Sequence, residues 1–149
     1  MGLVRMIVTK PDIWERFSDG VDAETFFPST TAANQWILVM EETDIIGVIY
    51  LHCDTSCSIG FHPYLLSKHR VKGREMMKVF FNWFLENIPE SIVKINVVIP
   101  DCFKSAVNFA KKVGFKLEGI SRESYTQEDK ICDRIMLGIT RSEVQKWAA

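Results

Sequence analysis

The strongest constraint on the fold is a long stripe of apolar residues within Val71–Asn87 and just beyond it. Apolar side chains fall at positions 76, 77, 80, 81, 84, 85 and 88, a spacing typical of a helix with one buried face. Pro89 ends this segment, and the apolar run Ile92–Ile99 that follows stops at Pro100, as expected of a buried central strand. This pairing of a long amphipathic helix with a buried strand predicts an α/β protein.

The rest of the sequence divides into short strands and helices around this unit. A second helical stripe begins at Phe103 and ends at Gly114, a residue that suits a helix C-terminus. Short helices are expected from Pro11 and over Val21–Phe27. The expected strands are Leu3–Thr9, Trp36–Glu41, Ile45–His52, Cys57–His62, Ile92–Ile99, Phe115–Glu123 and Cys132–Ile139. We therefore predict a single α/β (α+β) domain over residues 1–149, with a mixed central sheet of about seven strands and flanking helices.

Composition excludes several classes of protein. The chain has 149 residues, the length of one domain, and its 47% hydrophobic and 25% charged residues are typical of a globular protein. The formal net charge of −1 gives no general attraction to nucleic acid, and no apolar run approaches the roughly 18 residues of a membrane span. Four cysteines do not make a dense disulfide framework, so we expect reduced thiols and a cytoplasmic location.

A basic loop lies directly before the long helix. The segment His69–Glu75 combines Arg70, Lys72 and Arg74 with Gly73. The first N–H groups of a helix have no partner within it, and the helix dipole is positive there, so this end attracts anions. Glycine lets the backbone approach a ligand closely, and arginine binds phosphate through two parallel hydrogen bonds. We interpret the loop as a phosphate-binding site, with a solvated basic turn as the alternative.

The order of these segments resembles the GNAT superfamily of N-acetyltransferases. A strand, the motif Arg70-x-x-Gly73, a long helix, a strand and a second helix ending at Gly114 follow one another as in that family. The family's loop has the form Gln/Arg-x-x-Gly-x-Gly/Ala and binds the pyrophosphate of coenzyme A through its amides. Ala106–Gly119 is similar to the second helix that contacts coenzyme A and to its exit. The resemblance implies the GNAT fold for the whole domain.

Two groups within the family are the most similar. Arg122–Trp147 resembles the subgroup that acetylates protein N-termini and ribosomal proteins, and His62-Pro63-Tyr64-Leu65 resembles small phage-encoded proteins of GNAT type. The second likeness leaves open a catalytically degenerate phage virion or assembly protein that acts as a scaffold or binding module. Such a protein would lie in the virion or in the host cytoplasm.

The resemblance implies that the chain binds acetyl-CoA and transfers its acetyl group to a primary amine. The acceptor is a protein N-terminus, a lysine or a small amine, and a homodimer or a virion assembly partner is a further candidate. No membrane and no nucleic acid partner is implied. The implied coenzyme A-binding residues are Phe61, Arg70, Val71, Lys72, Gly73, Arg74, Glu75 and Phe103.

Several positions depart from the family pattern. Glu75 stands where the family has Gly or Ala, and its carboxylate would repel a pyrophosphate unless it points away or pairs with a cation. Ala110, four residues before Gly114, stands where many members have the tyrosine that protonates the coenzyme A thiolate. Phe103 and Ala106 replace an Asn and a Ser of the ribosomal subgroup. These changes remove the usual acid and favour the scaffold alternative.

Two residues are candidates for proton transfer. An amine acetyltransferase needs a base for the attacking ammonium and gains from an acid for the leaving thiolate. His62 ends a strand beside the expected acyl site and is the candidate base, because histidine titrates near neutral pH. Tyr125 is the candidate acid. Purely structural roles are the alternatives for both. Cys102 is a candidate acyl acceptor or oxidisable thiol, with a small buried hydrophobe as the alternative.

No metal site is expected, although His52, Cys53, Cys57 and His62 lie close together in the sequence. Neighbouring residues of a strand point to opposite faces of the sheet. His52 and Cys53 therefore cannot easily bind the same ion.

Overall fold

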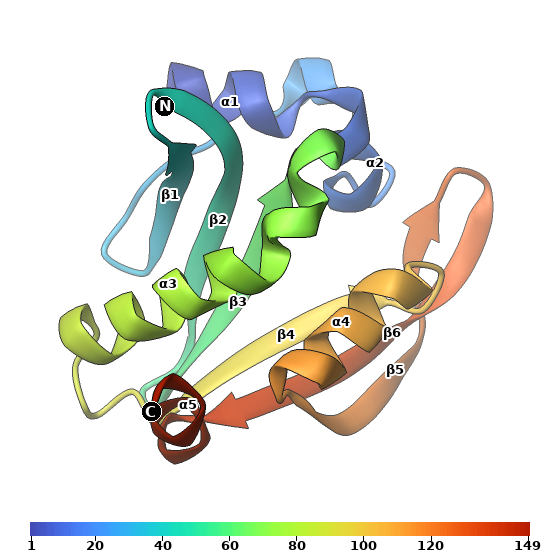
Figure 1. Ribbon diagram of the computed structural model, residues 1–149. Coiled ribbons are helices and arrows are strands. Elements are labelled where there is room, and N and C mark those ends of the chain that lie inside the picture. The colour runs from blue at the N-terminus through green and yellow to red at the C-terminus, as the bar shows by residue number, and fades with distance from the viewer.

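The computed structural model describes all 149 residues, which form one six-stranded sheet with helices on both faces (Figure 1). The strands are β1 (Asn34–Glu41), β2 (Asp44–Thr55), β3 (Ser58–Leu65), β4 (Lys94–Pro100), β5 (Lys116–Gln127) and β6 (Lys130–Thr140). The helices are α1 (Gly2–Val8), α2 (Pro11–Phe17), α3 (Gly73–Asn87), α4 (Lys104–Val113) and α5 (Arg141–Ala148), with short 3-10 helices η1 (Ala23–Thr25) and η2 (Ser67–Lys72). The strand order is β1-β2-β3-β4-β6-β5, and only β3 and β4 are parallel neighbours. The predicted mixed α/β sheet is confirmed, with six strands in place of about seven.

The long helix α3 forms where the apolar stripe predicts it and covers one face of the sheet. Its buried side chains are Met76, Met77, Phe80, Phe81 and Phe84. The ring of Phe80 stacks on Phe61 of β3, with the ring centroids 4.2 Å apart. Burying one side chain of this size stabilises the fold by about 1.5–3 kcal/mol, so the stripe fixes α3 firmly against the sheet. Neither α3 nor any other helix has the length and apolar character needed to cross a membrane.

The segment Leu3–Thr9, which the sequence predicts as a strand, forms the helix α1 instead. Its buried residues are Val4, Ile7 and Val8, which lie on one face of the helix and belong to the same apolar cluster as Val48 of β2. A short apolar segment fits both a helical and a strand period. Here the burial of one helical face outweighs the strand preference of valine and isoleucine. The prediction was wrong for this reason, and the seventh strand does not exist.

Two further segments differ from the prediction. Val21–Phe27 does not form a helix beyond the single 3-10 turn η1. The helix α5 is absent from the prediction, although its N-terminus carries a capping box. The hydroxyl of Thr140 accepts the N–H of Glu143, and the carboxylate of Glu143 accepts the N–H of Thr140. The Thr-x-x-Glu spacing of Thr140 and Glu143 is the sequence pattern that could have predicted the start of this helix.

Arg141, the first residue of α5, joins this helix to the end of α3. Its buried guanidinium donates hydrogen bonds to the backbone carbonyls of Leu85 (3.3 Å), Ile88 (2.8 Å), Pro89 (3.2 Å) and Ile92 (2.9 Å). The last carbonyls of a helix have no hydrogen-bond partner within it, and the helix dipole is negative at this end. A cationic donor can bond these carbonyls and is attracted by the dipole. Arg141 therefore holds α5 against the loop that leads from α3 into β4.

The two parallel strands at the centre of the sheet pair only at their beginnings. Residues 58–60 of β3 lie opposite residues 94–96 of β4. Beyond this point the strands diverge, because β3 remains paired with β2 while β4 remains paired with β6 (Figure 1). The facing backbone edges of residues 61–65 and 97–100 therefore have no strand partner. Unpaired edges of this kind are available to hydrogen-bond a ligand.

Candidate active site

A cavity of about 410 Å³ lies where β3 and β4 diverge. Its apolar lining includes Phe61, Met77, Val97, Phe109 and Phe115. The charged or polar lining residues include Asp12, Arg16, His62 and Arg70. Small-molecule sites commonly have volumes of about 300–1,000 Å³ and a few polar groups in an apolar wall. The cavity can therefore enclose a narrow apolar chain that ends in a charged group.

The structure brings four of the eight implied coenzyme A-binding residues to this cavity: Phe61, Arg70, Gly73 and Phe103. The other four do not line it. Val71 is 90% exposed, and Arg74 also faces solvent. Lys72 and Glu75 line a different groove between α3 and β1.

Lys72, the last residue of η2, and Glu75 of α3 both face β1. Lys72 forms an ion pair with Glu41 of β1. Together with Glu75 these residues line a groove of about 390 Å³ that is separate from the cavity beside Arg70. Glu75 therefore lies on the side away from the cavity. In this position its carboxylate would not repel a pyrophosphate bound beside Arg70.

The basic loop is tied to helix α2. The Arg70 side chain donates a hydrogen bond from Nη2 to the carbonyl oxygen of Asp12, at 3.1 Å. The N–H of Ser67 donates to the Asp12 carboxylate at 2.7 Å, and this bond lowers the pKa of Asp12. No side chain caps the N-terminus of α3 at Lys72, so the N–H groups of its first turn have no partner from such a cap. The N–H of Gly73 donates to the carbonyl oxygen of Arg70, so the end of η2 is also fixed to the start of α3.

Gly73 allows α3 and α4 to approach each other. A Cβ atom at this position would lie 3.1 Å from Cζ of Phe109 on α4, closer than carbon atoms normally come. The glycine of the loop motif therefore has a packing role that the sequence pattern does not reveal, in addition to any role toward a ligand.

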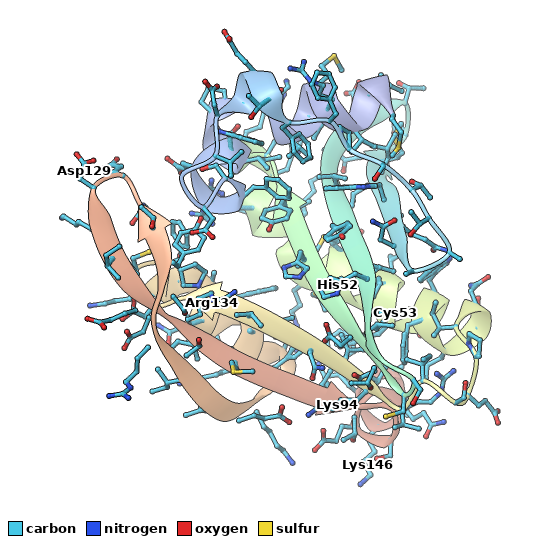
Figure 2. The ribbon with its side chains drawn as sticks, turned by 180° about the vertical axis from the view of Figure 1, so that it is seen from behind. His52, Cys53, Lys94, Asp129, Arg134 and Lys146 are labelled. Atoms are coloured by element: carbon cyan, nitrogen blue, oxygen red, sulfur yellow. The ribbon has the colours of Figure 1, made fainter.

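His62 lies at the divergence of the strands and contacts a second histidine. Its Nε2 atom is 3.0 Å from Nε2 of His52 on β2, and the two rings stack with centroids 5.1 Å apart. Nδ1 of His52 lies 3.1 Å from the carboxylate of Asp54. Burial, together with the charge of His52, lowers the pKa of His62 to about 4. Figure 2 shows this face of the sheet, with His52 below the N-terminal helices and above Lys94.

Tyr125 does not line the cavity. Its side chain is buried, and its hydroxyl donates a hydrogen bond to the carbonyl oxygen of Arg16 at 3.1 Å. Burial raises its pKa. The observed contact fastens the β5–β6 hairpin to α2, which is the structural role that the sequence left open for this residue.

Two other lining residues, Tyr64 and Arg16, are not among the site residues predicted from the sequence. Tyr64 of β3 lines the cavity, and burial raises the pKa of its hydroxyl. Arg16 of α2 lies with its guanidinium carbon 5.4 Å from the centroid of the Phe103 ring, and its buried Nε atom has no hydrogen-bond partner. Burial, and next the charge of Arg70, lower the pKa of Arg16. Both residues reach the cavity through long-range packing, which local patterns do not show.

The α4 side of the cavity has no acid. Ala110 is buried and lines the wall, so no hydroxyl stands at this position. Cys102 lies just before α4, where burial and the neighbouring thiol of Cys132 raise its pKa to about 11. The thiolate is the form that accepts acyl groups, and a raised pKa makes it scarce at neutral pH.

No protein-family model and no curated protein matches the chain. Solved structures do match it. The spermidine N-acetyltransferase from Vibrio cholerae in complex with CoA and spermine is 18% identical, with 76% of this chain and 69% of that chain covered and a TM-score of 0.67. Mutant forms of the spermidine/spermine N-acetyltransferase SpeG from the same organism are 19% identical, with 79% of this chain and 70% of that chain covered and a TM-score of 0.70.

A third structure, smu.2055 from Streptococcus mutans UA159, is 19% identical, with 74% of this chain and 72% of that chain covered and a TM-score of 0.62. Similarity at this level of identity concerns the fold. The diverging parallel strands, the loop before α3 and the order of the elements agree with it. The chain has the GNAT fold.

Proposed function

We propose that the chain is an acyl-CoA-dependent N-acetyltransferase that moves an acetyl group from acetyl-CoA to a primary amine. The observation that carries the proposal is the cavity between the diverging strands β3 and β4, with Arg70 and the uncapped end of α3 at its edge. An apolar channel beside unpaired backbone and a cationic helix terminus fits a ligand with an amide-bearing arm and a pyrophosphate.

The donor would lie along β3. The backbone of residues 61–65 has no partner on the β4 side, so its N–H and C=O groups can bond the amides of the pantetheine arm. Arg70 and the N–H groups of α3 that follow Gly73 would bind the pyrophosphate. Gly73 lies where α3 meets the cavity, and Phe61 and Phe103 form apolar walls.

His62 would act as the base for the attacking amine. It lines the cavity and lies on β3 next to the point where the strands separate. Acetyl-CoA supplies an activated thioester, which a neutral amine attacks directly once the two are held together. The acceptor is a protein N-terminus, a lysine or a small amine. The spermidine N-acetyltransferases that share the fold give the scaffold alternative of a phage virion protein no support.

Thermal unfolding in the presence of acetyl-CoA tests the proposal. Ligand at about 100 times its dissociation constant raises the free energy of unfolding by about 2.7 kcal/mol. Arg70→Ala should reduce this shift because it removes the cation at the cavity edge. Arg122→Ala, which removes an exposed arginine that does not line the cavity, is the matched control. An unchanged melting temperature of the wild-type protein at millimolar acetyl-CoA would refute the proposal.

A further inference from the structure

We propose that His62, His52 and Asp54 form a proton relay that accepts the proton of the amine and returns it to the leaving thiolate. His52 and Asp54 are positioning residues in this relay, since they act through His62. The inference rests on the proposed acetyltransferase function. It assigns a role to two side chains for which the sequence predicts no part in catalysis.

The contacts of the three side chains form one continuous line. Nε2 of His62 lies 3.0 Å from Nε2 of His52, and Nδ1 of His52 lies 3.1 Å from Oδ1 of Asp54. The other carboxylate oxygen of Asp54 accepts a hydrogen bond from the amide of Asn96 at 2.9 Å. The carboxylate is therefore fixed from both sides, by β2 and by β4.

Gly60 has no side chain, and this leaves the room that the imidazole of His52 occupies. The two residues lie opposite each other on β3 and β2. A Cβ atom at Gly60 would lie only 2.2 Å from Nε2 of His52. Any other residue would displace the imidazole from the place where it meets His62. The local structure of β3 thus serves the contact between the two histidines.

The hydrogen bonds assign the protons. A carboxylate only accepts hydrogen bonds, so Nδ1 of neutral His52 carries the proton that faces Asp54. Nε2 of His52 then has a free lone pair and accepts the Nε2–H of His62. The remaining nitrogen of His62, Nδ1, has a lone pair and is the atom that can take a proton from the substrate.

The relay solves the difficulty that His62 alone is a weak base. A pKa of about 4, against the ordinary 6.5, makes its imidazole about 300-fold less basic. When Nδ1 takes a proton, the Nε2 proton can pass to His52, and the positive charge then lies beside Asp54. The His52 and Asp54 side chains are 32% and 28% exposed, so solvent also stabilises that charge.

The proton balance closes within one turnover. As the C–N bond forms and the C–S bond breaks, the sulfur leaves as a thiolate with the bonding electron pair. The amine gives one proton to Nδ1 of His62, and His62 gives its Nε2 proton to His52. The thiolate then takes the proton from Nδ1, and His52 returns its proton to His62. Ala110 leaves the site without the usual acid, and the relay supplies the proton instead.

Few other charged groups surround the two histidines. Tyr50 of β2 lies against both imidazoles, with ring centroids 5.5 Å and 5.8 Å away. Lys94, two residues before Asn96 on β4, is paired with Glu118 of β5 at 2.7 Å. From α2, Arg16 lines the same cavity as His62. Asp54 is thus the anion in contact with the pair.

The variants Asp54→Asn and His52→Gln test the relay, with turnover measured against pH. Both should lower kcat/KM by about 10- to 1,000-fold, since proton transfer by a positioned side chain contributes about 100- to 10,000-fold. Affinity for acetyl-CoA should stay within about twofold, because neither residue lines the cavity. The acid limb of the kcat/KM profile should move to lower pH in Asp54→Asn, because the protonated pair loses its anion. Asp44→Asn, at the other end of β2, is the matched control.

Imidazole ¹⁵N spectra of the wild-type protein give a second readout that needs no turnover. We expect His52 to be protonated at Nδ1 and His62 at Nε2. The opposite tautomers would overturn the relay, as would an Asp54→Asn enzyme with wild-type kcat/KM and an unmoved acid limb. A wild-type protein that binds no acetyl-CoA and acetylates no amine would instead refute the proposed function itself.

Discussion

The partly buried His62 gives the fold a measurable dependence on pH. Burial lowers its pKa from 6.5 to about 4. As the pH falls, the unfolded chain therefore binds a proton before the folded chain does, and this stabilises the unfolded state. The free energy of unfolding is highest above pH 6.5 and falls through the interval between pH 6.5 and pH 4.

The size of the effect follows from the two pKa values. Between pH 7.5 and pH 5 the free energy of unfolding should fall by about 2 kcal/mol because of this one group. Near pH 4 and below, the loss approaches about 3 kcal/mol. The variant His62→Gln has no group to titrate and should lack this contribution. Its amide can still bond His52, so the contact between β2 and β3 is retained.

Urea unfolding at pH 7.5 and at pH 5 measures the difference. In this range the carboxyls whose pKa the fold lowers, Asp12 and Glu143, remain mostly charged in both states, so the histidine dominates. His69→Gln is the matched control, because it removes a histidine that does not contact the pair. Equal slopes of the unfolding transition in all three proteins are needed for the comparison. If His62→Gln loses as much stability as the wild-type protein on acidification, the burial argument is wrong.

Three further substitutions test other contacts. Gly60→Ala should displace His52 and lower kcat/KM by about 10-fold or more, with acetyl-CoA affinity unchanged and stability within about 1 kcal/mol; wild-type activity would refute the close contact. Arg141→Met should lower the free energy of unfolding by about 2–4 kcal/mol, because four carbonyls lose a charged donor, and urea unfolding measures this. Thr140→Ala should cost about 1 kcal/mol in the same assay, since the capping box with Glu143 is lost; no change would mean that water replaces the cap.

Periodicity in the sequence predicts the parts of the fold that are long and strongly patterned. The stripe of α3 spans several turns, and only one face of it can be buried, so the pattern has one solution. The segment that becomes α1 is too short for its apolar pattern to distinguish a helix from a strand. Val4, Ile7 and Val8 are buried because the sheet offers an apolar surface to them, and the sequence of the segment itself does not contain that surface.

Some residues of the candidate site can also be predicted from the sequence, and others cannot. Arg70 and Gly73 lie in a local motif, and a local motif can be found in the sequence. No local motif reveals the roles of His52 and Asp54, because these roles depend on the register between β2 and β3. His52 lies opposite Gly60 only because the strands pair as they do, and a shift of one residue would turn its side chain to the other face of the sheet.

The position of Glu75 shows how helix geometry changes the meaning of a departure from a family motif. Successive residues of a helix are rotated by about 100°, so Glu75 lies roughly 200° around α3 from Gly73. Gly73 faces the cavity and Glu75 faces β1 and the groove with Lys72. The acidic residue therefore does not oppose an anion at the cavity. Ala110 does line the cavity, so in the proposed function the proton donor would come from another residue, and His62 of β3 lines the same cavity.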